Sequence, residues 1–119
     1  MLSTLISAIV LIILDSTYLY LMGGYFKRQV KAVQGSPLEM NLVGAALCYV
    51  FIIFGLNYFI IKNRKSVKDA FLLGIVIYAI FELTNLALFK NWHIFSVLID
   101  TLWGGILFGL TTGIVYKLT

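Results

Sequence analysis

Four runs of apolar residues, separated by short polar segments, account for most of the chain. They cover Leu2–Phe26, Leu38–Ile61, Ala70–Phe89 and Ile94–Tyr116. A helix needs about 20 predominantly apolar residues to cross the hydrocarbon core of a bilayer, and each run reaches that length. The runs are apolar on all sides, which excludes the alternating strands of a transmembrane barrel. We therefore predict an all-α protein, an integral membrane four-helix transmembrane bundle, with residues 1–119 as a single transmembrane domain.

Composition and charge support this class. Hydrophobic residues make up 61% of the 119 residues and charged residues 12%, against about 45–50% and about 25% in soluble globular domains. A soluble core of this size could not bury so many apolar side chains. The low charge and the single Cys48 exclude a disordered chain, a nucleic-acid-binding domain and a disulfide scaffold. The expected partner is a lipid bilayer, with no nucleic acid.

The basic residues between the spans bear on orientation. Five Lys or Arg residues lie on the side of both termini and four on the other side, which is a small difference. The segment Lys62–Lys68 is the densest basic cluster, so we predict from the positive-inside bias that it and both termini are cytoplasmic. The first span lacks a preceding basic residue and a following cleavage pattern, so we expect it to be retained and not removed as a signal peptide.

Three acidic residues, Asp15, Glu82 and Asp100, lie inside the first, third and fourth spans, and no Lys, Arg or His lies inside any span. An ionised acid in mid-helix costs roughly 2.5–3.5 kcal/mol. Each acid must therefore be protonated, hydrated in a cavity or bound to a cation. The third and fourth spans are joined by a short turn, so Glu82 and Asp100 should both lie roughly 10 Å below the same membrane face and face one another. Asp15 should lie about one helical turn deeper.

Helical spacing adds polar neighbours to these acids. Tyr18 and Trp103 each follow an acid by three residues, and could donate a hydrogen bond to a carboxylate on the neighbouring helix. The binding residues that we predict are Asp15, Tyr18, Tyr78, Glu82, Asn85, Asp100 and Trp103. The structural alternative is that the same residues only hold helices together, at about 0.6–2 kcal/mol each. That alternative is favoured for Asn85 taken alone, and Trp92 is interpreted as an anchor at the membrane interface.

The fourth span also carries Gly105, Gly109 and Gly113 at a spacing that lets helices approach closely. Gly109 follows Asp100 by nine residues, which is about half a turn around the helix, so these glycines face away from the acid. Two interpretations of this helix-packing pattern stay open. The fourth span packs between neighbours within the chain, or its glycine face joins a homodimer or a larger membrane assembly.

The residue types also limit the chemistry. With one His, one Cys and no Glu-x-x-His sequence, one chain cannot build a bis-His haem site, a zinc site of nitrogen and sulfur ligands or a bundle-type di-iron centre. We predict no cofactor, while a hard cation bound by oxygen atoms stays open and the metal is unknown. No phosphate-binding glycine loop or nucleophile elbow is present. The sequence thus favours a role other than catalysis without deciding the question.

The stretch Glu82–Ala87, followed by Trp92 and then Asp100–Gly104, is the most specific motif in the chain. Together with Asp15 it resembles a family of small predicted membrane proteins catalogued as domain of unknown function 2177, and the resemblance spans essentially the whole chain. Glu82 stands where an Asp is more usual and Tyr18 where a Trp is more usual, and both differences keep the chemistry. The resemblance implies four helices and no particular activity. Its motif positions include Asp15, Glu82, Asn85, Asp100 and Trp103.

Three functional hypotheses follow. The first is a binding or transport module whose intramembrane carboxylate cluster handles protons, a cation or a cationic solute. The alternative is a non-catalytic structural or accessory membrane subunit that packs through the glycine stripe. The third is an intramembrane lipid-modifying enzyme with a carboxylate as general acid or base, for which the sequence offers no recognisable nucleophile.

Overall fold

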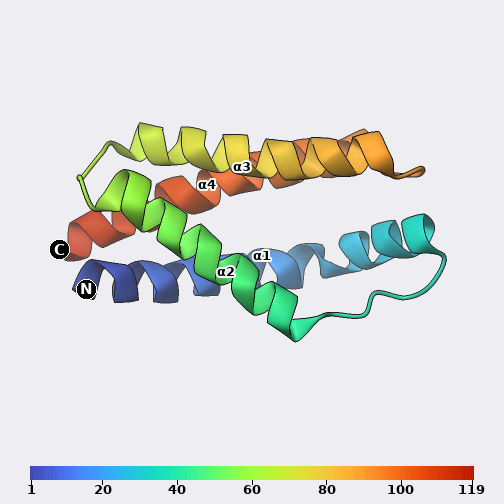
Figure 1. Ribbon diagram of the computed structural model, residues 1–119, viewed down its shortest axis with the longest axis horizontal. Helices are drawn as coiled ribbons and strands as arrows, with labels where there is room; N and C mark the ends of the chain where they lie inside the picture. Colours follow the sequence, from blue (N-terminus) through green and yellow to red (C-terminus); the bar gives the residue numbers. More distant parts are fainter.

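A computed structural model describes residues 1–119 as four long helices without a strand (Figure 1). The helices are α1 (Leu2–Gln34), α2 (Leu42–Leu56) with a π-helical continuation η1 (Asn57–Ile61), α3 (Val67–Leu88) and α4 (Ile94–Leu118). All four, with α2 and η1 counted together, are long and apolar enough to cross a membrane. The prediction of an all-α, four-helix membrane protein is confirmed.

The helix ends are set by local chemistry. α1 continues beyond the first predicted span and stops at Gly35, whose φ of 77° lies in the left-handed region that Gly adopts without a steric penalty. α2 begins after Asn41 and α3 after Ser66, and each of these side chains accepts a hydrogen bond from a backbone N–H in the first turn of its helix. Such capping satisfies backbone donors that the helix itself leaves unpaired.

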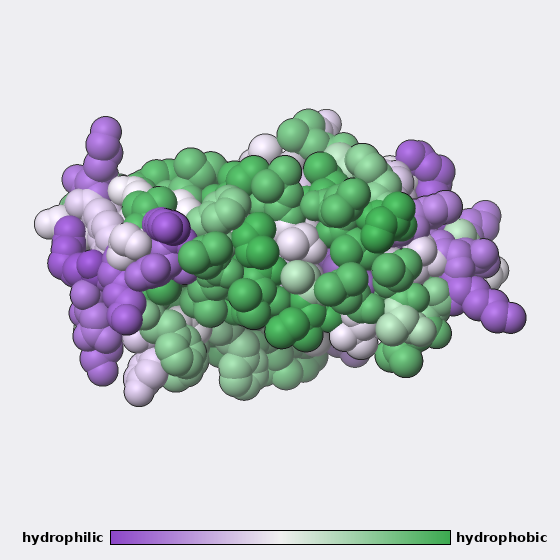
Figure 2. All heavy atoms as spheres, turned by 90° about the horizontal axis from the view of Figure 1, so that it is seen from above, coloured by the Kyte–Doolittle hydropathy of each residue, from purple (hydrophilic) through white to green (hydrophobic).

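The surface has the layering of a bilayer-spanning protein. The body measures 46 × 24 × 21 Å, and a bilayer with its headgroup regions is about 40–45 Å thick. Figure 2 shows hydrophobic residues across the middle of one face and hydrophilic residues gathered at both ends. Both termini lie at the same end of the bundle (Figure 1). The protein is therefore an integral membrane protein, and the cytoplasmic location of the termini stays a prediction.

The closest helix pair is α3 with α4. A Cβ atom added to Gly74 would lie 2.1 Å from the carbonyl oxygen of Gly104, and one added to Gly104 would lie 2.3 Å from the ring of Tyr78. Only glycine fits at such a backbone approach, as in other small-residue helix contacts in membranes. This contact lies beside the acidic residues of both helices and fixes their relative height.

The other helices pack less evenly around this pair. α1 packs on α4, and it meets the η1 end of α2, where the Asn57 amide donates to Ser7 Oγ at 2.8 Å. α2 makes few contacts with α3 and runs obliquely across α1 (Figure 1). The buried apolar cluster therefore occupies mainly the half of the bundle nearer the termini. Its members are Leu11, Leu56, Ile60, Ile61, Ala70, Leu107, Phe108 and Val115.

Candidate functional site

The three intramembrane acids are all buried, each on a different helix. Asp15 on α1, Glu82 on α3 and Asp100 on α4 have exposed fractions of only 8%, 1% and 9%. The carboxyl groups of Glu82 and Asp100 lie close enough to interact with one another. Ionised carboxylates only accept hydrogen bonds, so a direct hydrogen bond between the two groups would need a proton on one of them. The prediction that Glu82 and Asp100 face one another is confirmed.

Aromatic side chains of α1 and α4 each donate a hydrogen bond to the acidic residue of the other helix. The Tyr18 hydroxyl donates to Asp100 Oδ1 at 3.3 Å, and the Trp103 indole N–H donates to Asp15 Oδ1 at 3.0 Å. The rings of Tyr18 and Trp103 stack with centroids 4.6 Å apart and planes 3° from parallel. This reciprocal arrangement confirms the hydrogen bonds that the three-residue spacing predicted. It also locks the rotation of α1 relative to α4.

Two further donors were missed by the sequence reasoning. Tyr49 on α2 donates its hydroxyl proton to Asp15 Oδ2 at 2.5 Å, and Trp92 donates its indole N–H to Glu82 Oε1 at 2.9 Å. The interpretation of Trp92 as an interface anchor alone is therefore incomplete. In the sequence, only the position of Trp92 just after the span that carries Glu82 indicated this contact. Nothing in the sequence indicated the contact between Tyr49 and Asp15, because the span of Tyr49 contains none of the three acids.

The remaining two predicted binding residues lie outside this network. Tyr78 packs over Gly104 and meets the ring of Phe108 edge to face, with centroids 6.3 Å apart. Its side chain also lines a cavity that reaches Asp100. Asn85 is half-buried, and no hydrogen bond joins its amide to the acids. The structure thus brings Asp15, Tyr18, Glu82, Asp100 and Trp103 together, places Tyr78 beside them and leaves Asn85 apart.

A second polar network joins the end of α1 to the turn before α4. Gln29 is 3% exposed, and its amide nitrogen donates to the Asn91 carbonyl at 2.7 Å. Its amide oxygen accepts from the His93 backbone N–H at 3.0 Å and from the Ser96 hydroxyl at 2.7 Å. Ser96 also contacts the Tyr25 hydroxyl at 2.7 Å. These bonds satisfy a buried amide and hold the long extension of α1 against the start of α4.

The acids do not form a metal cage. No group of three or more His, Cys, Asp or Glu side chains lies close enough to hold a metal ion. A hard cation such as Ca²⁺ takes six to eight oxygen ligands, whereas both oxygens of Asp15 and one oxygen each of Glu82 and Asp100 already accept a hydrogen bond from a Tyr or Trp donor. Chemically, these carboxyl groups can hold a proton or accept hydrogen bonds from a charged donor.

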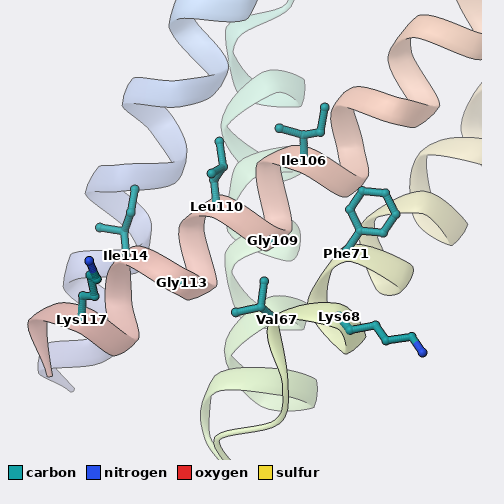
Figure 3. A pocket seen from close by; sticks show the side chains of 9 residues that line it. All are labelled: Val67, Lys68, Phe71, Ile106, Gly109, Leu110, Gly113, Ile114 and Lys117. Carbon is teal, nitrogen blue, oxygen red and sulfur yellow. The ribbon is translucent and has the colours of Figure 1, made fainter.

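The glycine stripe of α4 faces α3 of the same chain, but not uniformly. A Cβ atom on Gly105 would lie 2.8 Å from Ile75 and Phe71, whereas the nearest atoms would be 3.7 Å away at Gly109 and 3.9 Å at Gly113. A side chain at Gly105 would therefore require the ends of the Ile75 and Phe71 side chains to shift. Gly109 and Gly113 line an open apolar groove of about 620 Å³, away from the acids, with Lys68 and Lys117 at its rim (Figure 3).

Comparison with known proteins gives one match. A family model described as "Predicted membrane protein (DUF2177)" matches residues 1–117. No curated protein and no solved structure matches the chain. The chain belongs to this family of predicted multi-pass membrane proteins, in agreement with the resemblance of its acidic and aromatic motifs.

Proposed function

We propose that this member of the DUF2177 family is an intramembrane binding module whose buried carboxyl groups exchange protons or hold a cationic solute. The observation that carries the proposal is the burial of three carboxyl groups from three helices, with Asp15 and Asp100 linked through the stacked rings of Tyr18 and Trp103 and no basic side chain inside the apolar runs to neutralise them. In this proposal Glu82 and Asp100 are the pair that exchanges a proton. Asp15, held by Tyr49 and Trp103, is a positioned acceptor beside them.

The chemistry of the pair favours a function over a purely structural role. Hydrogen bonds between membrane helices contribute only about 0.6–2 kcal/mol each, and Ser, Thr or Asn side chains can supply them. An acid adds the liability of ionisation, which costs roughly 2.5–3.5 kcal/mol in mid-membrane. What an acid offers in return is a proton that can be given up or a charge that can pair with a cation. Three acids at one site are difficult to explain by packing alone.

Infrared spectroscopy of the chain reconstituted in lipid tests this proposal. We expect a carboxylic-acid C=O band that shifts in D₂O and titrates reversibly with pH. Glu82→Gln and Asp100→Asn should each diminish it, because either change removes one member of the pair. Asp69→Asn is the matched control, since Asp69 is an exposed acid at the start of α3. A band that ignores pH, or that is the same in all variants, would leave the acids as structural hydrogen-bonding groups only.

A second candidate is a non-catalytic structural or accessory subunit. It is favoured by the open groove at Gly109 and Gly113, where the chain itself does not require glycine. If a partner helix docks there, Gly109→Leu should break the assembly through steric separation and leave the infrared band of the acids unchanged. The oligomeric state, measured in detergent by size exclusion with light scattering, separates this role from the proposed one.

A further inference from the structure

A small cavity opens between α2 and α3 beside the acid network. Its volume is about 270 Å³, and a single carboxyl group lies in its otherwise apolar lining. The lining residues are Cys48, Ile52, Ile77, Tyr78, Phe81 and Asp100. Drug-sized ligands occupy pockets of roughly 300–1,000 Å³, so this cavity has room for a smaller molecule that is mostly apolar.

The cavity opens sideways, toward the bilayer. Ile77 and Phe81 on α3 are 37% and 57% exposed, and Cys48 on α2 is exposed as well. These residues lie in the middle of their helices, far from the polar ends of the bundle, so hydrocarbon is what surrounds them. The opening exists because α2 makes few contacts with α3. A ligand that reaches Asp100 by this route comes from the lipid phase.

Asp100 is a suitable end point for such a ligand. It is nine-tenths buried and lines the cavity. Its carboxyl group accepts one hydrogen bond from an aromatic side chain, that of the Tyr18 hydroxyl at 3.3 Å. Its other polar neighbour is the Glu82 carboxyl group. An ionised carboxylate has about four acceptor positions. Acceptor capacity therefore remains for a donor placed in the cavity.

We propose that this cavity binds a lipophilic amine, with its nitrogen at Asp100 and its alkyl part against Ile52, Ile77 and Phe81. This inference rests on the proposed function and names the class of its solute. A neutral amine enters hydrocarbon far more cheaply than a cation. At the site it takes the proton shared by Glu82 and Asp100: an N–H bond forms, a carboxyl O–H bond breaks, and the ammonium lies beside two carboxylates, so the net charge of the site stays at minus one. The new ion pair is joined by charge-assisted hydrogen bonds.

The test uses the full chain in dodecyl maltoside micelles, with n-octylamine as the probe and 1-octanol as its uncharged counterpart. Octylamine should raise the melting temperature by several degrees in a saturable manner, as a ligand specific to the folded state does, and octanol should not. Asp100→Asn should abolish the rise. Ile77→Trp, which fills the cavity, should abolish it too, whereas Ile80→Trp on the lipid-facing side of α3 should retain it. If Ile77→Trp fails to fold, Cys48→Phe fills the cavity from α2.

The outcomes separate this inference from the proposed function. An equal rise with octanol, or a rise that survives both Asp100→Asn and the cavity-filling variant, overturns the amine site. Loss in Asp100→Asn without loss in the cavity-filling variants overturns the lateral route. If octylamine has no effect while the carboxylic-acid band still titrates, the amine site is wrong and proton exchange stands. If the band does not titrate, the proposed function itself fails.

Discussion

Gly74→Ala tests the close approach of α3 and α4 that places Glu82 beside Asp100. The added Cβ atom would lie 2.1 Å from the carbonyl oxygen of Gly104 and 2.7 Å from its carbonyl carbon. Both are backbone atoms of a helix, and they cannot swing aside as the end of a flexible side chain would. The two helices must therefore move apart or tilt. Either movement weakens the contact between the two acids.

The magnitude follows from two opposing effects. Overpacking of a well-packed contact costs about 1–3 kcal/mol, and the clash with backbone places Gly74→Ala at the upper end. The higher helix propensity of Ala offsets about 0.8–1.0 kcal/mol, which leaves a net loss of about 2 kcal/mol in the free energy of unfolding. The matched control is Gly109→Ala, whose Cβ atom meets nothing closer than 3.7 Å. It should be neutral or stabilising by up to about 1 kcal/mol.

Unfolding in mixed micelles, with rising sodium dodecyl sulfate and circular dichroism as the readout, measures both free energies. The carboxylic-acid infrared band of Gly74→Ala should weaken at the same time, because the acids separate with the helices. Equal stability of the two alanine variants would show that α3 and α4 do not meet backbone to backbone. The same conclusion would follow if Gly74→Ala were more stable than the parent chain.

Three further changes probe the polar contacts and the orientation. Trp103→Phe keeps an aromatic ring against Tyr18 but removes the donor to Asp15, and should lower the free energy of unfolding in the same micelle assay by about 1–3 kcal/mol. Gln29→Leu strands the backbone groups that this amide now satisfies, so hydrogen exchange at the His93 amide should become faster, with no change at the far end of α4. A reporter fused after Thr119 should respond as cytoplasmic, and an extracytoplasmic response would reverse the predicted orientation.

Run length was sufficient to predict the four helices, because the thickness of the hydrocarbon core dictates how many apolar residues each one needs. It could not predict where α1 ends. Lys27, Arg28 and Lys31 are too polar for the bilayer interior, yet they are compatible with a helix in water. Hydropathy predicts which residues cross the bilayer, but a helix can continue beyond them into water. The end of α1 coincides with the left-handed conformation of Gly35.

The candidate site, too, could be predicted only in part from the sequence. Counting residues from the turn predicted the common depth of Glu82 and Asp100, and helical spacing predicted the donors Tyr18 and Trp103, because both are properties of single helices. Tyr49 reaches Asp15 only because of the angle at which α2 crosses α1. Such angles depend on tertiary packing, which periodicity along one helix does not define.

Both proposals depend on the contact between the Glu82 and Asp100 carboxyl groups. Solid-state NMR of the chain in bilayers, with ¹³C-labelled Asp and Glu, observes it directly, and the chain has only five acidic residues, so Glu82→Gln and Asp100→Asn suffice to assign the signals. We expect a correlation between the two carboxyl carbons and a chemical shift for the pair that moves reversibly with pH. Absence of the correlation, or carboxyl shifts that are independent of pH, would contradict a shared and exchangeable proton.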